Sequence, residues 1–86
     1  MDWDRVGYVV RSRHRLLALQ HLQGPPLMPS VLAKRLNVSI SHASQLLAGL
    51  VDKGLVRCLN PGMTRGRLYT TTPSGKEVLD SVRRRT

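Results

Sequence analysis

Residues 29–56, PSVLAKRLNVSISHASQLLAGLVDKGLV, hold two helix patterns separated by a short turn. Pro29 favours a helix start, because its missing N–H is one that the first helical turn leaves unpaired anyway. Asn37-Val38 suits a tight turn, Ser39 is a good N-cap for the second helix, and Gly54 suits its end. The stretch therefore predicts a short helix, a turn and a longer helix.

The second of these helices, predicted over 40–53, has two different faces. Apolar residues at helical spacing form one face: Ala43, Leu46, Leu47, Leu50 and Val51. The opposite face is small and polar in its first two turns and carries no negative charge there; it presents Ser41, His42, Gln45, Gly49 and Asp52. Glycine costs up to about 1 kcal/mol relative to alanine inside a helix. At Gly49 either a neighbouring backbone therefore comes close or the helix is weakened.

Beyond Gly54 the pattern changes from helix to strand. Residues 55–59 and 67–71 are short apolar or β-branched runs, and a turn-rich loop, 60–66, lies between them. This arrangement predicts a two-stranded antiparallel ribbon. Because an isolated ribbon is marginally stable, we expect it to lean on the helices.

Further helices are predicted at both ends of the chain. Thr72-Pro73 supplies a cap and a first residue for a C-terminal helix over about 73–84. In the N-terminal segment 4–22, the apolar spacing is helical from Ser12 onward. Residues 6–10 leave two possibilities, a short strand or a first helical turn, because they combine glycine with three β-branched residues.

The order of elements is thus helix, helix, turn, helix, strand, loop, strand, helix. A chain of 86 residues and 9.6 kDa allows one domain, which we place over 1–86. The fold class is α+β and mostly helical, with a three-helix core, a two-stranded β wing and a C-terminal helix. The helix-turn-helix spans about 29–53 and the wing about 55–71.

The charge of the chain points to a polyanionic partner. Fourteen basic residues against five acidic ones give a net charge of +9. The acids stand only at positions 2, 4, 52, 77 and 80, so long basic stretches contain none. Nucleic acid is the commonest polyanion that attracts such a domain. An anionic membrane fits less well, because no helix sets a basic face against a large apolar one.

Several other classes are excluded by the same composition. No apolar run approaches a membrane span, and the acidic start MDWDR differs from a secretory signal. One cysteine, Cys58, is too few for a disulfide or a structural zinc site. No clustered carboxylates, nucleophile motif or phosphate-binding glycine loop suggests an enzyme. We expect a cytoplasmic, non-enzymatic protein that binds no membrane, metal or cofactor.

Residues 29–56, followed by GRLYTTTPSGKEVL at 66–79, resemble the small winged helix-turn-helix transcriptional regulators of the MarR-like and ArsR-like kind, short archaeal members above all. The resemblance covers about 12–82 and departs from the family pattern at Met28, where Thr or Ser usually caps the helix. It implies a regulator that binds specific double-stranded DNA with a recognition helix and a wing. No ligand-sensing domain is evident in the sequence, so the ligand-responsive members of the family do not imply a small-molecule effector here.

The resemblance and the polar face together assign the recognition residues on and before the second helix: Ser39, Ser41, His42, Ser44 and Gln45. Gln45 can pair with adenine through two hydrogen bonds, and serine suits donor or acceptor edges of bases. Ser39 and Ser44 have an equally plain alternative, in which the first only caps the helix and the second bonds its own helix.

Basic and hydroxyl-bearing residues elsewhere are predicted to contact the DNA backbone. In the wing these are Thr64, Arg65 and Arg67, which are expected at phosphates or in the minor groove. Around the first helix of the pair, Ser30, Lys34 and Arg35 suit phosphates. Arg67 could instead begin the strand and lie over it, and Lys34 and Arg35 could simply be solvated.

The N-terminal segment is predicted to take part in a homodimer. Trp3 and Tyr8, with the three valines of 6–10, form an apolar patch that is large for so small a core. Together with the C-terminal helix they suit a two-fold symmetric interface. The alternative is a monomer whose N-terminal segment folds back on its own core. Two other functions also remain open, a protein-interaction module of a transcription or RNA-processing assembly and a non-specific architectural DNA binder.

Overall fold

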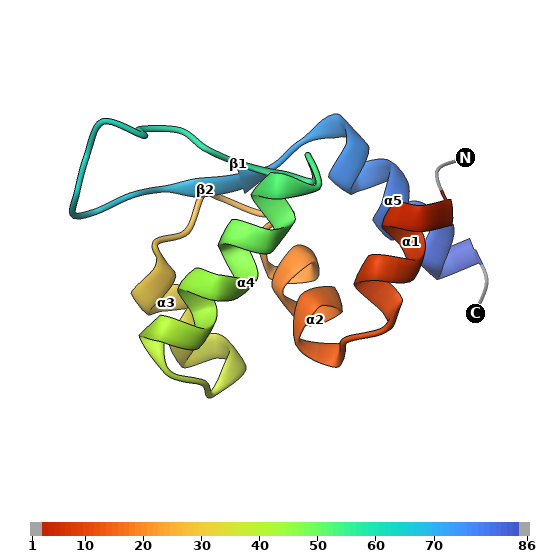
Figure 1. The fold of residues 1–86 in the computed structure, drawn as a ribbon, viewed down its shortest axis with the longest axis horizontal. Coiled ribbons are helices and arrows are strands. Elements are labelled where there is room, and N and C mark those ends of the chain that lie inside the picture. Colours follow the sequence, from red (N-terminus) through yellow and green to blue (C-terminus); the bar gives the residue numbers. More distant parts are fainter. Residues whose placement is uncertain (1–2, 85–86) are drawn as a thin grey trace.

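The computed structural model describes residues 3–84, which form the elements shown in Figure 1. The helices that come first are α1 (Trp3–Val10), α2 (Arg13–His21), α3 (Pro29–Leu36) and α4 (Ile40–Asp52). Strands β1 (Val56–Cys58) and β2 (Tyr69–Thr71) and helix α5 (Pro73–Arg84) follow. The mostly helical α+β fold with a two-stranded wing is confirmed; residues 1–2 and 85–86 of the predicted domain lie outside the described residues. Within residues 3–84, no helix is long and apolar enough to span a bilayer.

The helix-turn-helix forms where its caps predict it. Pro29 is the first residue of α3, and Met28 before it makes no side-chain capping bond, as the departure at that position led us to expect. Asn37 takes up the left-handed conformation, with φ 58°, and turns the chain toward α4. The Ser39 hydroxyl then accepts the His42 N–H at 3.0 Å. These caps fix where α3 and α4 meet, and the two helices pack on each other.

The wing is a short antiparallel ribbon. Its strands pair in register from Val56 opposite Thr71 to Cys58 opposite Tyr69. Each strand is shorter than the predicted runs 55–59 and 67–71. A third segment joins the ribbon, because Leu27 and Tyr69 exchange two backbone hydrogen bonds of 3.0 and 2.9 Å. The chain just before α3 is thereby tied to the wing.

Residues 6–10 are helical and belong to α1, which decides between the two possibilities for them. Val6 and Val9 face inward from α1 and are almost fully buried. Their spacing of three residues is that of one helix face, whereas a strand would turn them to opposite sides. Ser12 is the N-cap of α2, because its hydroxyl accepts the Arg15 N–H at 3.3 Å.

The core joins both ends of the chain. Helix α1 lies beside α5 (Figure 1), and the inward residues of both helices belong to one hydrophobic cluster with the leucines of α2, α3 and α4. The apolar N-terminal patch predicted as a dimer surface is therefore divided. Val6 and Val9 pack on the core of their own chain, as in the alternative in which the N-terminal segment folds back. Trp3 and Val10 stay 59% and 47% exposed.

Candidate nucleic-acid interface

The outer side of α4 carries a polar face, formed by Ser41, Ser44 and Gln45, that is open to solvent. All three side chains are exposed, as is Ser39 at the cap. The Ser39 hydroxyl is occupied with the His42 N–H, so capping is its structural role. Within residues 3–84, the Ser44 hydroxyl makes no hydrogen bond to its own helix. The α4 polar face thus presents donors and acceptors without a charge.

His42 differs from the other predicted recognition residues. It is half-buried, and its ring meets the ring of His14 edge to face, with centroids 5.0 Å apart and planes 87° apart. His14 comes from α2, so the pair joins α2 to the first turn of α4. His42 is therefore less open to solvent than Ser41 and Gln45, because its ring packs against α2. No local spacing in the sequence signals this pairing.

The wing loop, residues 59–68, is held by the side chain of Asn60. Its Oδ1 accepts the backbone N–H of Leu68 at 2.8 Å, and its Nδ2 donates to the carbonyl of Gly66 at 3.1 Å. The Cys58 thiol also approaches Oδ1, at 3.6 Å. One amide therefore bridges the two sides of the loop. In the sequence, Asn60 stands out only as the first residue of the turn-rich loop 60–66, and no local pattern there signals its bridging role.

The two wing arginines have different environments. The Arg67 guanidinium donates to the carbonyls of Met63 and Pro61, at 2.6 and 3.3 Å, and so braces the loop from within. It neither lies over the strand nor extends freely. Arg65 and Thr64 are exposed, and within residues 3–84 the Arg65 side chain makes no hydrogen bond or ion pair. Arg65 is thus a cation of the wing loop that is available to a partner.

A groove of about 360 Å³ lies between α4 and the wing and links two of the predicted groups. Its lining comes from the start of α3, from α4 and from the wing: Pro29, Ser44, Ala48, Thr64, Gly66, Arg67 and Tyr69. Ser44 of the α4 polar face and Thr64 of the wing therefore border the same concave surface. The helix and the wing form one continuous surface here.

A second groove, of about 460 Å³, lies along the outer side of the turn between α3 and α4. It is lined by Ser30, Ala33, Lys34, Asn37, Val38, Ser39 and Ile40. Two predicted phosphate contacts, Ser30 and Lys34, thus lie beside the cap of α4. Arg35 is exposed but does not line this groove.

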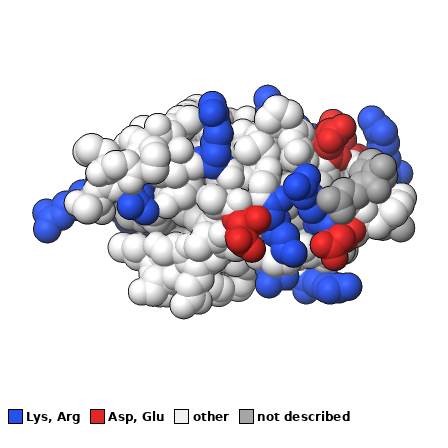
Figure 2. Space-filling view, turned by 45° about the horizontal axis from the view of Figure 1, so that its top comes forward, with Lys and Arg blue, Asp and Glu red and all other residues white. Residues whose placement is uncertain are grey.

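Charge is distributed unevenly between the two ends of the molecule. The described acids lie on α1, at the end of α4 and on α5: Asp4, Asp52, Glu77 and Asp80. In the view of Figure 2, acidic side chains lie near the middle and on the half away from the wing, where basic ones also gather, while the wing end shows basic ones without acidic ones. The α4 polar face and the wing therefore lie in the part of the field that attracts anions.

We expect the substitution Asn60→Ala to loosen the wing loop. It leaves the half-buried N–H of Leu68 without its acceptor, which costs about 1 kcal/mol or more. Hydrogen exchange at the Leu68 amide should become much faster, and urea unfolding should show the loss of stability. Asn60→Asp is the matched control, since it keeps an acceptor for Leu68; equal exchange rates in the two variants would contradict the bridging role.

Comparison with known proteins shows the family to which the chain belongs. Residues 3–86 match the family described as HVO_A0261 N-terminal domain. An uncharacterized HTH-type transcriptional regulator, YdgG of Bacillus subtilis, is 32% identical over 85 residues, which cover 95% of this chain and 55% of that protein. The chain thus spans about half the length of this curated relative, which is named as a regulator and not as an enzyme.

Solved structures share the fold. The MarR repressor of Listeria monocytogenes superposes with a TM-score of 0.70 at 25% identity, over 78% of this chain and 46% of that one. FabT of Streptococcus pneumoniae, solved in complex with DNA, gives a TM-score of 0.73 at 20% identity, over 85% of this chain and 52% of that one. The resemblance to winged helix-turn-helix regulators is confirmed, and the chain belongs to the HVO_A0261 N-terminal domain family.

Proposed function

We propose that this chain is the DNA-binding domain of a sequence-specific transcriptional regulator. The observation that carries the proposal is the surface formed by the exposed, uncharged α4 polar face and the basic wing beside it. A helix that reads bases needs neutral donors and acceptors, while its flanks need cations for phosphates. A regulator of this kind acts where the chromosome is, which for a prokaryotic chain is the cytoplasm.

In this proposal α4 enters the major groove. Its N-terminal half reaches base edges, as in other helix-turn-helix domains. Gln45 offers an amide that suits the N6 and N7 edge of adenine, and Ser41 and Ser44 suit donor or acceptor edges. His42, which is half-buried against His14, contributes to the placement of the helix.

The DNA backbone is contacted on both sides of α4. Ser30 and Lys34 line the groove beside the α4 cap, and Arg35 extends from the same exposed side of α3. On the other side Arg65 extends from the wing, while Arg67 keeps the loop in shape for it. Thr64 borders the groove between wing and helix, where a phosphate can accept its hydroxyl.

Two copies of the domain would suit a palindromic DNA site. The exposed apolar residues at the α1–α5 end, Trp3 and Val10, lie away from the wing and leave the α4 polar face open. A two-fold interface there would place two α4 helices on half-sites spaced by whole helical turns of DNA. We therefore propose a homodimer through α1 and α5, with the buried valines of α1 serving the core of each protomer.

The test is selection of bound duplexes from a random pool at moderate salt. We expect the wild-type chain to enrich one sequence pattern. Gln45→Ala should lose the preference at one base pair of that pattern, by about tenfold, because a bidentate side-chain contact contributes about that much discrimination.

Gln20→Ala provides the control, because Gln20 is an equally exposed glutamine on α2. It should select the wild-type pattern. Enrichment of no pattern, with equal binding to all duplexes, would replace the regulator by an architectural DNA binder. Absence of duplex binding at low salt would instead favour a protein-interaction module.

A further inference from the structure

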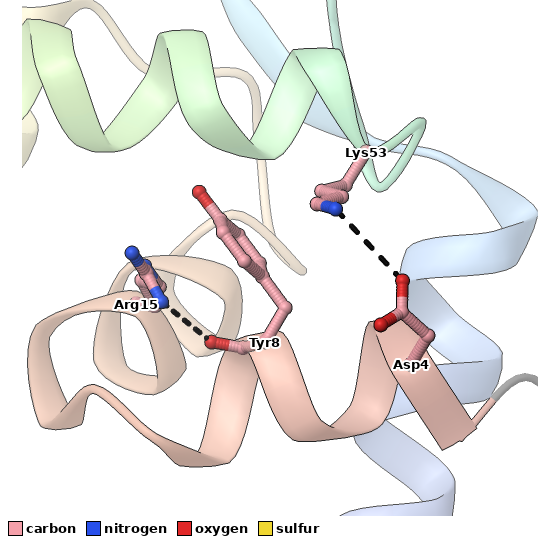
Figure 3. Close-up of polar contacts among 4 residues, drawn as sticks. All are labelled: Asp4, Tyr8, Arg15 and Lys53. Carbon is pink, nitrogen blue, oxygen red and sulfur yellow. Dashed lines mark hydrogen bonds and ion pairs between the residues drawn. The ribbon is translucent and has the colours of Figure 1, made fainter.

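The Tyr8 side chain extends from α1 to α4 and is enclosed by charged neighbours (Figure 3). The Arg15 guanidinium carbon lies 3.9 Å from the ring centroid, and the Lys53 ammonium lies 5.3 Å from it. Arg15 also donates to the Tyr8 carbonyl at 3.0 Å, and Lys53 pairs with Asp4 at 3.8 Å. With cations beside its ring and a backbone bond at its base, Tyr8 has little freedom to move.

The Tyr8 hydroxyl lies against α4 at Gly49. It lies so near the Cα of Gly49 that a Cβ at this position would overlap it. This approach explains why one of the poorest helix-forming residues stands inside α4. The sequence left two possibilities at Gly49, a close neighbouring backbone or a weakened helix; the close neighbour is a side chain from α1.

Gly49 lies on the side of α4 that the N-terminal helices contact. It follows Gln45 by one turn and His42 by two, so all three lie along adjoining positions of the helix surface. The N-terminal helices therefore contact α4 twice on this side. His14 of α2 meets the first turn, and Tyr8 of α1 meets the third.

We propose that Tyr8 is a positioning residue for DNA recognition, which sets the placement of α4, and with it that of Gln45, through its contact with Gly49. This inference rests on the proposed function, because it assumes that the α4 polar face meets DNA. Tyr8 itself lies on α1 and contacts no DNA in this arrangement. Loss of the Tyr8 ring, or a methyl group added at Gly49, should consequently alter recognition in a chain that remains folded.

The contact can be broken and restored by two substitutions. Gly49→Ala adds a methyl group that must push the Tyr8 hydroxyl away. Tyr8→Phe removes that hydroxyl, and the ring carbon that bore it would lie 3.5 Å from the added methyl, an ordinary contact. The double variant should therefore regain the wild-type placement of α4. Tyr8→Leu removes the ring altogether and offers no rescue.

The experiment measures affinity for the selected duplex and for a random duplex, at a temperature where every variant is folded. We expect Gly49→Ala and Tyr8→Leu to lose about tenfold of the preference for the selected duplex, as much as one base contact supplies. Tyr8→Phe and the double variant should stay within about threefold of wild type. Gly7→Ala is the matched control, since its methyl would meet only the flexible Arg11 side chain, at 3.8 Å.

Backbone amide chemical shifts of residues 41–45 give a second readout that needs no DNA. They should move in Gly49→Ala and Tyr8→Leu and return in the double variant. If the wild-type chain prefers no duplex, the proposed function fails while the shifts still test the positioning role. If Gly49→Ala does not fold, Tyr8→Leu and the double variant test it. Unchanged shifts and preference in Tyr8→Leu, or no rescue in the double variant, would overturn the inference.

Discussion

Replacing Gly75 with alanine should lower the free energy of unfolding by about 2–3 kcal/mol, the cost of forcing extra atoms into a well-packed interior. Gly75 is buried in the first turn of α5. An added Cβ would overlap the carbonyl oxygen of Leu55 and the hydroxyl of Thr71. The carbonyl cannot simply withdraw, because it also accepts the N–H of Thr72 at 3.0 Å.

The start of α5 has little room to shift away from this overlap. The Thr72 hydroxyl donates to the carbonyl of Gly54 at 2.7 Å and accepts the N–H of Gly75 at 3.1 Å. The cap of α5 is thus fixed to Gly54, which follows the C-cap of α4, and movement of α5 would break these bonds. The better helix propensity of alanine returns only about 1 kcal/mol.

Urea unfolding followed by circular dichroism measures the effect, with Gly7→Ala as the control. Gly7 lies within α1, and its added methyl finds ordinary contact distances, so that variant should gain about 0.5–1 kcal/mol. A Gly75→Ala variant as stable as Gly7→Ala would show that α5 does not approach Leu55 this closely.

Signals from neighbouring residues in the sequence were sufficient to predict most of the helices and strands. Pro29 and Ser39 mark helix starts by mechanisms that depend only on neighbouring residues, and both helices begin as predicted. The limits of the strands were less predictable. Leu68, for example, bonds to the side chain of Asn60 in the loop and lies outside β2. The Leu27–Tyr69 bridge has no local signal, because it joins residues far apart in the chain.

The candidate site was predictable only where exposure follows from helix periodicity. Ser41, Ser44 and Gln45 are exposed because they lie opposite the apolar stripe of α4. His42 lies at the border of that stripe, and its ring is half-buried against His14. The role of Gly49 was noticed as an anomaly of propensity, but its partner Tyr8 belongs to a helix that periodicity cannot place in space.

Salt should weaken DNA binding steeply. Each cation that neutralises a phosphate contributes about 0.9 to the slope of log affinity against log salt. Lys34, Arg35 and Arg65 are the exposed cations of the proposed interface, whereas Arg67 is engaged with loop carbonyls. For one domain, the affinity should therefore fall about 40-fold between 50 and 200 mM salt. For a dimer, with twice the contacts, it should fall about 2,000-fold.

Arg65→Gln distinguishes a phosphate contact made by the wing from the attraction that the net charge of the chain exerts on DNA. It should weaken binding to selected and random duplexes alike and lower the slope by about 1 for each domain bound. Arg84→Gln removes the same charge at the end of α5, away from the wing, and should leave the slope unchanged. Equal slopes for the two variants would mean that the positive field acts as a whole and that the wing makes no phosphate contact. Because the slope counts contacts, the same titration decides whether one or two domains occupy a site.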